Sequence, residues 1–259
     1  MLLMSSPVLT TVEDSIGIIS INNPPANVLT EEVFRGLDSA FETFLADTSI
    51  RGIILTGEGG NFAAGADISQ IATLTDEEEG ERTSLEGQKM GQRIWNSPVP
   101  VLAAINGYAL GGGSELALCC HLRIATTKAR IGQPEIKHGF IPGMGGTIRL
   151  PRVVGPTKAM ELLLTGEPIG PEEAHRIGLI NFVVHEDELK RQAMGLLKKI
   201  GRLGREATEN TLQAVRKGID LPLEEALKLE SKLFGELMPT GNKKEGVNAF
   251  LEKRTPIFT

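Results

Sequence analysis

The chain has 259 residues, 41% of them hydrophobic, and its formal net charge at pH 7 is −6. This length is sufficient to bury a substantial core, in one large domain or in a domain with an appendage. The acidic balance argues against nucleic acid or an anionic membrane as the main partner, and no apolar run approaches the roughly 18 residues that a membrane-spanning helix needs.

The start of the chain lacks the pattern of a targeting segment. Residues 1–10 show neither the charged-then-apolar order of a signal peptide nor the arginine-rich composition of a transit peptide. The two cysteines, Cys119 and Cys120, are neighbours in an apolar run, where buried thiols are expected rather than a disulfide. We therefore expect a cytoplasmic protein.

The first part of the chain predicts a hairpin, a helix and a third strand. Apolar residues alternate or run together over 8–13 and 16–21, which is typical of a hairpin. A short buried strand is expected at 53–56. Between them, Thr30 is placed to cap a helix that lies on a sheet, because apolar residues follow it at helical spacing: Val33, Leu37, Phe41 and Phe44.

Two stretches after the third strand are polar or rich in small residues. Residues 57–67 are rich in glycine, but they match neither a dinucleotide-binding fingerprint nor a phosphate-binding loop. The acidic run 76–81 is expected to be a solvated, mobile loop rather than a metal site. Apolar residues at 85, 90 and 94 predict a helix that ends before Pro98.

The stretch Gly107–Glu115 follows the most convincing buried strand, 99–105, and precedes an apolar helical run, 116–120. Three consecutive glycines at a strand-to-helix junction bring bare backbone close to another group, and the helix start adds partial positive charge. One interpretation is that the Gly112 N–H binds a developing oxyanion while Glu115 transfers protons beside it. The other is a packing turn in which Glu115 is only a charge in the first turn of a helix.

The rest of the chain continues as α/β structure to about residue 185 and is helical beyond. Short strands are expected at 122–125, 129–131 and 182–184, and helices at 157–164, 171–175 and 186–200. The helical segment 189–203 has an apolar face formed by Leu189, Met194, Leu196, Leu197, Ile200 and Leu203. Its basic residues lie largely off that face, which favours a solvated surface over an RNA or membrane patch.

Further helices are expected to begin near Asp220 and, capped by Thr240, near the end of the chain. Both carry many apolar positions. They therefore need a surface to cover, either on the same chain or on a neighbouring subunit.

Several motifs resemble the crotonase (enoyl-CoA hydratase/isomerase) family, in the order in which that family has them. They are Phe62-Ala-Ala-Gly-Ala-Asp-Ile68, Asn106-Gly-Tyr-Ala-Leu-Gly-Gly-Gly-Ser-Glu115, Gly132-Gln-Pro-Glu-Ile136, Ile141-Pro-Gly-Met-Gly-Gly-Thr147 and Ala249-Phe-Leu-Glu-Lys-Arg254. The resemblance covers nearly the whole chain.

The resemblance implies an α/β fold, a crotonase-like spiral of strand-strand-helix repeats with a C-terminal helical trimerisation region. Residues 1–200 would form the spiral core and residues 201–259 the oligomerisation region. It implies a lyase of fatty acid metabolism, of the β-oxidation type, that binds acyl-CoA thioesters and assembles as a homotrimer or a dimer of trimers. No cofactor is expected, since coenzyme A is part of the substrate.

The resemblance also assigns roles to individual residues. The backbone N–H groups of Ala66 and Gly112 would receive the thioester oxygen. Glu115 and Glu135 match the two carboxylates of the hydratase branch, and we assign Glu115 to activating water and Glu135 to protonating the α-carbon. Residues near the CoA nucleotide and pantetheine would be Ala26, Val28, Ala64 and Ile68, with Phe250 and Lys253 reaching CoA from an adjoining subunit.

Two alternatives stay open at this point. One is a Δ3-Δ2 enoyl-CoA isomerase that shuttles a proton on one glutamate; the other is an RNA-binding relative that keeps the fold. Asp67 is either part of the site or an N-cap of the next helix. The four histidines have no metal-ligand spacing, and Ser114 lacks the sequence context of a hydrolase nucleophile.

Overall fold

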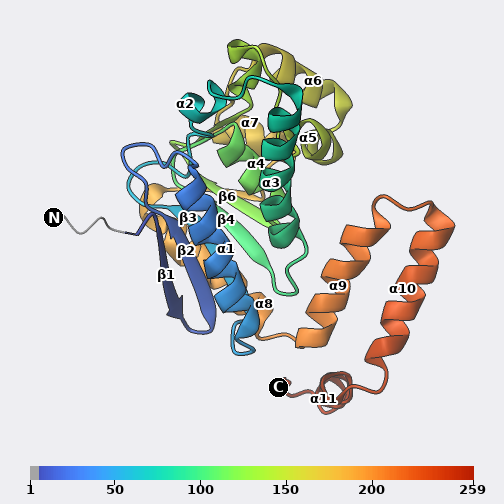
Figure 1. Ribbon diagram of the computed structural model, residues 1–259. Helices are drawn as coiled ribbons and strands as arrows, with labels where there is room; N and C mark the ends of the chain where they lie inside the picture. Colours follow the sequence, from blue (N-terminus) through green and yellow to red (C-terminus); the bar gives the residue numbers. More distant parts are fainter. Residues whose placement is uncertain (1–5) are drawn as a thin grey trace.

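Figure 1 shows the computed structural model of the protein, which describes residues 6–259. Residues 1–5 lie outside the described part. The expectation about a targeting segment in residues 1–10 and the predicted 1–200 region therefore fall partly outside the described residues. Among residues 6–259, no helix combines the length and hydropathy that crossing a bilayer requires.

The described chain alternates strands and helices up to β8 and is helical afterwards. In chain order the elements are β1 (Val8–Glu13), β2 (Ile16–Ile21), α1 (Glu31–Ala46), β3 (Gly52–Gly57), α2 (Ile68–Ile71), α3 (Glu77–Trp95), β4 (Val101–Ile105), β5 (Tyr108–Leu110), α4 (Gly112–Cys119), β6 (Leu122–Thr126), β7 (Arg130–Gly132), the 3-10 helix η1 (Pro134–His138), α5 (Gly146–Val154), α6 (Pro156–Thr165), α7 (Pro171–Arg176), β8 (Phe182–Val184), η2 (Glu186–Glu188), α8 (Leu189–Gly201), α9 (Arg205–Gly218), α10 (Leu223–Leu237) and α11 (Gly241–Leu251).

The main sheet has the strand order β1-β2-β3-β4-β6-β8 among the described residues. β1 and β2 form the expected antiparallel hairpin, and the other neighbours are parallel. Asp14 and Ser15 join the hairpin with φ angles of 50° and 63°, as a tight turn matched to the twist of the strands requires.

The chain winds three times through the same sequence of strand, short strand and helix. β3, β4 and β6 lie in the main sheet; Ala63, β5 and β7 then pair in parallel beside it. α3, α4 and α5 follow these short strands. This is the spiral of strand-strand-helix repeats that the resemblance implied.

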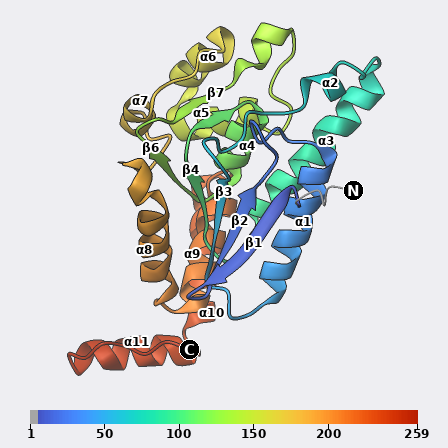
Figure 2. The same ribbon diagram turned by 90° about the vertical axis from the view of Figure 1, so that its left-hand side faces the viewer.

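The main sheet is covered on both faces, which explains why most positions of its parallel strands are apolar. α1 lies on one face and α8 on the other (Figure 2). The helix residues expected on the sheet, Val33, Leu37, Phe41 and Phe44, are all buried, and Thr30 caps α1 by accepting a hydrogen bond from the Val33 N–H. Cys119 and Cys120 are buried free thiols, as predicted.

The last three helices lie at one end of this body, and α9 contacts it, since Arg216 donates to the oxygens of Trp95 and Ser97 at 2.8 and 2.9 Å. α9 and α10 pair with each other as a hairpin, and α11 lies beneath them at the end of the molecule opposite α2 (Figure 1). The first turn of α11 contacts α9, since Asn242 donates to the Glu206 carboxylate at 2.7 Å. Thr240 caps α11 through the Lys243 N–H, as expected. The hairpin and α11 carry strongly exposed apolar side chains, among them Leu223, Phe234, Phe250 and Leu251.

The prediction that residues 76–81 form a loop is wrong, because they begin α3. Asp76 is the N-cap and accepts the Glu79 N–H at 2.8 Å, while a Glu79 carboxylate oxygen faces the Thr75 N–H. Acidic residues are stabilised in the first turn of a helix by its partial positive charge. The run is therefore a helix start and not a solvated loop.

The helix α5 was not expected from the sequence, α9 was covered only by the general expectation of helices beyond residue 185, and one apolar position differs from its prediction. α5 begins at a pair of glycines and contains Pro151, so it has the composition of a loop. α9 buries none of its residues in the chain, and its apolar side chain Val215 is exposed. Leu203, expected on the apolar face of 189–203, lies beyond the end of α8 and is 52% exposed.

We predict that Gly113→Ala destabilises the protein and that Gly195→Ala does not. A Cβ at Gly113 would lie 2.1 Å from the backbone oxygen of Ala63, whereas a Cβ at Gly195, on the exposed side of α8, meets nothing within 4 Å. Urea unfolding should show that Gly113→Ala lowers the free energy of unfolding by at least about 1–3 kcal/mol. Gly195→Ala should raise it by about 0.5–1 kcal/mol. Equal stabilities for the two variants would contradict the close approach of α4 to Ala63.

Candidate active site

The turn between β5 and α4 contacts two other segments through glycine backbone, with no side chain between them. Gly111 has a φ of 51°, and a Cβ there would lie 2.9 Å from Oε1 of Glu135. A Cβ at Gly113 would overlap the backbone of Ala63. The glycines therefore let the start of α4 touch both the 63–66 segment and the side chain of Glu135.

Glu115 lies in the first turn of α4 and is only 2% exposed. Its Oε1 accepts the N–H of Met144 and the N–H of Gly146, each at 2.7 Å. Burial raises the pKa of Glu115 to about 7, and the charge of Glu135 adds to the rise; the two N–H donors and Arg149 oppose it. A carboxyl with this pKa exchanges protons readily at neutral pH.

Glu135 lies on η1, is buried, and comes close to Gly111. Burial raises the pKa of Glu135 as well. Within residues 6–259 its Oε2 has no hydrogen-bond partner, so that atom is available to a reactant. The preceding Gln133 is also buried and donates to the Ser114 hydroxyl at 3.2 Å, which ties η1 to α4.

The structure thus brings both predicted carboxyls to one place, and it adds a contact that sequence analysis missed. Met144 and Gly146 belong to a quoted motif, but no role was assigned to them. The signal was the repeated glycine at 143, 145 and 146, because glycines just before a helix often expose main-chain N–H groups to a ligand.

The backbones of Ala66 and Gly112 lie side by side. The Ala66 nitrogen is 3.6 Å from the position of a Cβ on Gly112, and the Gly112 nitrogen is 3.8 Å from that of a Cβ on Gly65. Gly112 is the first residue of α4, so its N–H has no acceptor inside the helix. In the loops of the described chain, neither amide donates to a main-chain acceptor.

The segment 26–29 runs along the segment 64–66. Ala64 N–H donates to the Ala26 oxygen at 3.1 Å, and Leu29 N–H donates to the Gly65 oxygen at 2.8 Å. Asn27, buried and with a φ of 56°, fixes this arrangement because its side-chain amide donates to the backbone of Glu58 and Asn61.

The residues predicted to lie near CoA fall into two groups. Ala26, Val28 and Ala64 are half-buried along the paired segments just described, and Ile68 is exposed at the start of α2. Phe250 and Lys253 lie instead on and just after α11, which Figures 1 and 2 place at the opposite end of the molecule from α2. One chain does not bring these two groups together.

Several other candidates have structural surroundings. Asp67 is the N-cap of α2 and accepts the Ser69 N–H at 2.9 Å. His138 is exposed and stacks on Phe140. No group of histidine, cysteine, aspartate and glutamate in residues 6–259 could hold a metal ion.

The basic side chains of α8 are partly neutralised by acidic neighbours. Lys190 pairs with Glu13 at 2.8 Å, and Lys198 pairs with Asp14 in the β1–β2 turn. A solvated, ion-paired face agrees with the prediction for this helix and does not favour RNA.

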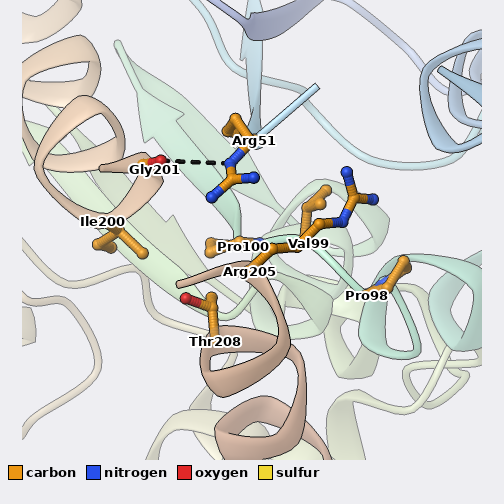
Figure 3. A pocket seen from close by; sticks show the side chains of 8 residues that line it. All are labelled: Arg51, Pro98, Val99, Pro100, Ile200, Gly201, Arg205 and Thr208. Atoms are coloured by element: carbon orange, nitrogen blue, oxygen red, sulfur yellow. Dashed lines mark hydrogen bonds between the residues drawn. The ribbon is translucent and has the colours of Figure 1, made fainter. Parts of the chain in front are cut away.

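Two hollows of the described chain lie away from the paired carboxyls. One, beside Arg51, Arg205 and Thr208 where α8 gives way to α9, measures about 10 Å³, which holds no more than a water molecule (Figure 3). Figure 3 also shows Arg51 donating to the Gly201 oxygen, at 3.2 Å. The other, about 270 Å³, lies on the main sheet beside the start of α8, between Thr11, Ile54 and Leu189.

Comparisons with known proteins agree with the resemblance. The model of the enoyl-CoA hydratase/isomerase family matches residues 11–259. A probable enoyl-CoA hydratase of Bacillus subtilis (strain 168) is 41% identical over 248 residues, covering 95% of this chain and 96% of the relative. A crotonyl-CoA hydratase of Syntrophomonas wolfei is 40% identical over 248 residues, covering 95% of each.

A solved structure gives the same result. The crystal structure of an enoyl-CoA hydratase from Bacillus anthracis matches with a TM-score of 0.92 and 35% identity, over 97% of this chain and 98% of that one. This likeness confirms the expected fold, mixed α/β with a helical C-terminal region.

We predict that Glu115 makes the protein less stable as pH rises from about 4.5 to 7. In the folded chain Glu115 keeps its proton up to about pH 7, whereas the unfolded chain releases it near 4.5. The folded state binds more protons between these values, so the free energy of unfolding falls with rising pH, by about 3 kcal/mol from this group.

The measurement is urea unfolding at fixed protein concentration, from pH 4.5 to 7.5, for the wild type and Glu115→Gln. The stability of the wild type relative to the variant should decline across this range. Glu58→Gln, at an exposed position, is the control and should follow the wild type. A constant difference between the wild type and Glu115→Gln would contradict the raised pKa.

Proposed function

The chain belongs to the enoyl-CoA hydratase/isomerase family, and we propose that it is an enoyl-CoA hydratase. It adds water reversibly across the 2,3 double bond of an α,β-unsaturated acyl-CoA and gives a 3-hydroxyacyl-CoA. The observation that carries the proposal is the buried pair Glu115 and Glu135, one held by two main-chain N–H groups and the other with an unpartnered oxygen.

The Ala66 and Gly112 N–H groups bind the thioester oxygen. Attack on the β-carbon moves negative charge onto that oxygen, and fixed N–H donors stabilise charge where it develops. The support is the close approach of these two amides and the lack of an intrahelical acceptor for Gly112. Because both donors belong to the main chain, the site depends on the backbone of the β5–α4 turn.

Glu115 takes a proton from water, and Glu135 gives one to the α-carbon. Burial raises the pKa of both carboxyls, so the pair binds a proton more readily than two exposed carboxyls would. The N–H groups of Met144 and Gly146 stabilise the carboxylate form that Glu115 needs as the base. The pair therefore shares one proton, with a base and an acid at neutral pH. After the reaction the proton taken by Glu115 passes back to Glu135 and restores the pair.

The proposal includes the CoA-binding residues and the assembly. Ala26, Val28, Ala64 and Ile68 line the path of the CoA nucleotide and pantetheine along the paired loops. Phe250 is 82% exposed on α11, far from that path, so it contacts CoA from an adjoining subunit together with Lys253. The protein then assembles as a homotrimer or a dimer of trimers through α9 to α11.

A Δ3-Δ2 isomerase would need one glutamate to move a proton between two carbons. Hydration needs two proton transfers, one from water and one to carbon. A second buried carboxyl with an unpartnered oxygen, such as Glu135, can carry out the second transfer. The presence of both residues favours the hydratase.

We predict that the wild type hydrates crotonyl-CoA, which appears as loss of absorbance of the conjugated thioester. Glu115→Gln and Glu135→Gln should each lower kcat by about 10²–10⁴-fold, because each removes a proton-transfer group. Acyl-CoA binding, measured by calorimetry, should stay largely unchanged in both variants.

Glu58→Gln serves as the matched control, since Glu58 is exposed on the loop after β3. It should retain wild-type turnover. An isomerase would leave crotonyl-CoA unhydrated, and full turnover in both site variants would remove Glu115 and Glu135 from the mechanism.

We predict that the wild type sediments as a trimer or hexamer and that Phe234→Asp, on α10, lowers the mass. Phe234 is 64% exposed in one chain, and a charge there opposes burial at an interface. Val12→Asp, on the exposed hairpin, is the control and should keep the wild-type mass. A monomeric wild type would overturn the proposed assembly.

A further inference from the structure

Arg149 on α5 is a cation without an anionic partner in the described chain. Its guanidinium carbon lies 5.4 Å from the centre of the Trp95 ring, and the side chain is half-buried. No carboxylate among residues 6–259 lies within ion-pair distance of it. An arginine over the face of a tryptophan ring is attracted by the ring and is held in one place.

The stem of Arg149 lies on the turn that binds Glu115. Gly145 has a φ of 110°, and a Cβ there would be 3.3 Å from the Arg149 Nε and 3.5 Å from its Cδ. Gly145 stands between Met144 and Gly146, whose N–H groups hold the Glu115 carboxylate. The Arg149 side chain therefore covers the backbone of the turn at its centre.

Trp95, which carries the guanidinium, is itself anchored at the end of α3. Its backbone oxygen accepts a hydrogen bond from His121 Nε2 at 3.1 Å and from Arg216 at 2.8 Å. His121 Nδ1 accepts the Val101 N–H, so the proton lies on Nε2, and burial lowers the pKa of His121 to about 4. The imidazole is therefore neutral at working pH, and its hydrogen bond to the Trp95 oxygen is present throughout that range.

The charged groups that act on Glu115 come from two elements. η1 contributes Glu135, which disfavours the charged form of Glu115, and α5 contributes Arg149, which favours it. Cys119, one turn along α4, has a pKa of about 11 and stays neutral. The helix α3 brings no charged group of its own to Glu115: it packs Gly87 and Gly91 against Met144 and Cys119, and its neutral side chains Ser84 and Gln88 donate to the Gly143 oxygen at 2.6 and 3.1 Å. Arg149 is thus the single cation in the described chain that offsets Glu135.

We propose that Arg149, held over the Trp95 ring with its stem on Gly145, is a positioning residue that holds the 143–146 turn around Glu115 and, through its charge, favours the carboxylate form of Glu115. The inference rests on the proposed function, in which Glu115 is the base that activates water. Arg149 does not touch the substrate in this account. It acts through the main-chain donors and through its charge.

The test is the pH dependence of kcat/KM for crotonyl-CoA. Arg149→Met keeps the length and apolar stem of the side chain but removes its charge. The acidic limb of the profile should move to higher pH by about one unit, because the base gains its proton more easily. Activity at a pH below the limb should fall about tenfold, with a smaller change above it.

Two further variants separate this role from a structural one. Arg149→Lys keeps a cation that can lie over the ring and should return the limb most of the way to its wild-type position. Arg152→Met is the matched control, since Arg152 lies on the same helix, carries the same charge, and pairs with Asp220 at 2.9 Å. It should leave the limb unchanged.

An unshifted limb in Arg149→Met, with an active wild type, would overturn the inference and leave the hydratase assignment intact. If Arg149→Met fails to fold, Trp95→Leu is the second variant, because it removes the ring that holds the guanidinium. The acidic limb of the kcat/KM profile of Trp95→Leu should also move to higher pH.

An inactive wild type would instead contradict the function, and the ionisation of Glu115 can then be followed without turnover. The carboxyl infrared band, assigned by subtracting the Glu115→Gln spectrum, should titrate at higher pH in Arg149→Met than in the wild type. Equal titration in the two would overturn the inference on that measure too.

Discussion

The site depends on the two main-chain N–H groups, from Met144 and Gly146, that hold one oxygen of Glu115. A carboxyl buried this deeply would otherwise keep its proton and be of little use as a base. The two donors offset part of the cost of burying the charge and lower the pKa of Glu115, which lies at about 7. They also fix the direction of the second oxygen. The rest of the fold can be understood as what brings the 143–146 turn, α4 and η1 together.

The spiral provides this convergence. Each turn of the chain leaves the main sheet at the carboxyl end of a parallel strand, passes through a short strand, and enters a helix. The loops of three successive turns therefore meet on one side, and each contributes one part: the backbone of 63–66, the start of α4, and η1 with the 143–146 turn. Gly111 and Gly113 allow contacts between these parts that any side chain would prevent.

Much of the fold could be predicted from the sequence where one local signal dominated. The alternation over 8–21, the capping by Thr30 and the apolar run 99–105 each specify one structure, and all three are confirmed. The acidic run 76–81 predicted a loop because its high charge is typical of loops. The N-cap signal of Asp76, with Glu79 three residues later, was the better indicator. α5 was missed because glycines at its start resemble a loop, although those same glycines expose the N–H groups that Glu115 needs. A single sequence does not indicate which carboxylate such donors face. The hydrogen bonds from Met144 and Gly146 to Glu115 could therefore be found only from the structure.

The central claim is that this site adds the elements of water to the two carbons of a conjugated thioester. The most direct measurement is the mass spectrum of the product formed from crotonyl-CoA in heavy water enriched in oxygen-18. The account predicts one labelled oxygen on the β-carbon and one deuterium on the α-carbon of each product molecule. A product with deuterium on the γ-carbon and no labelled oxygen would contradict it, since that pattern arises from double-bond migration.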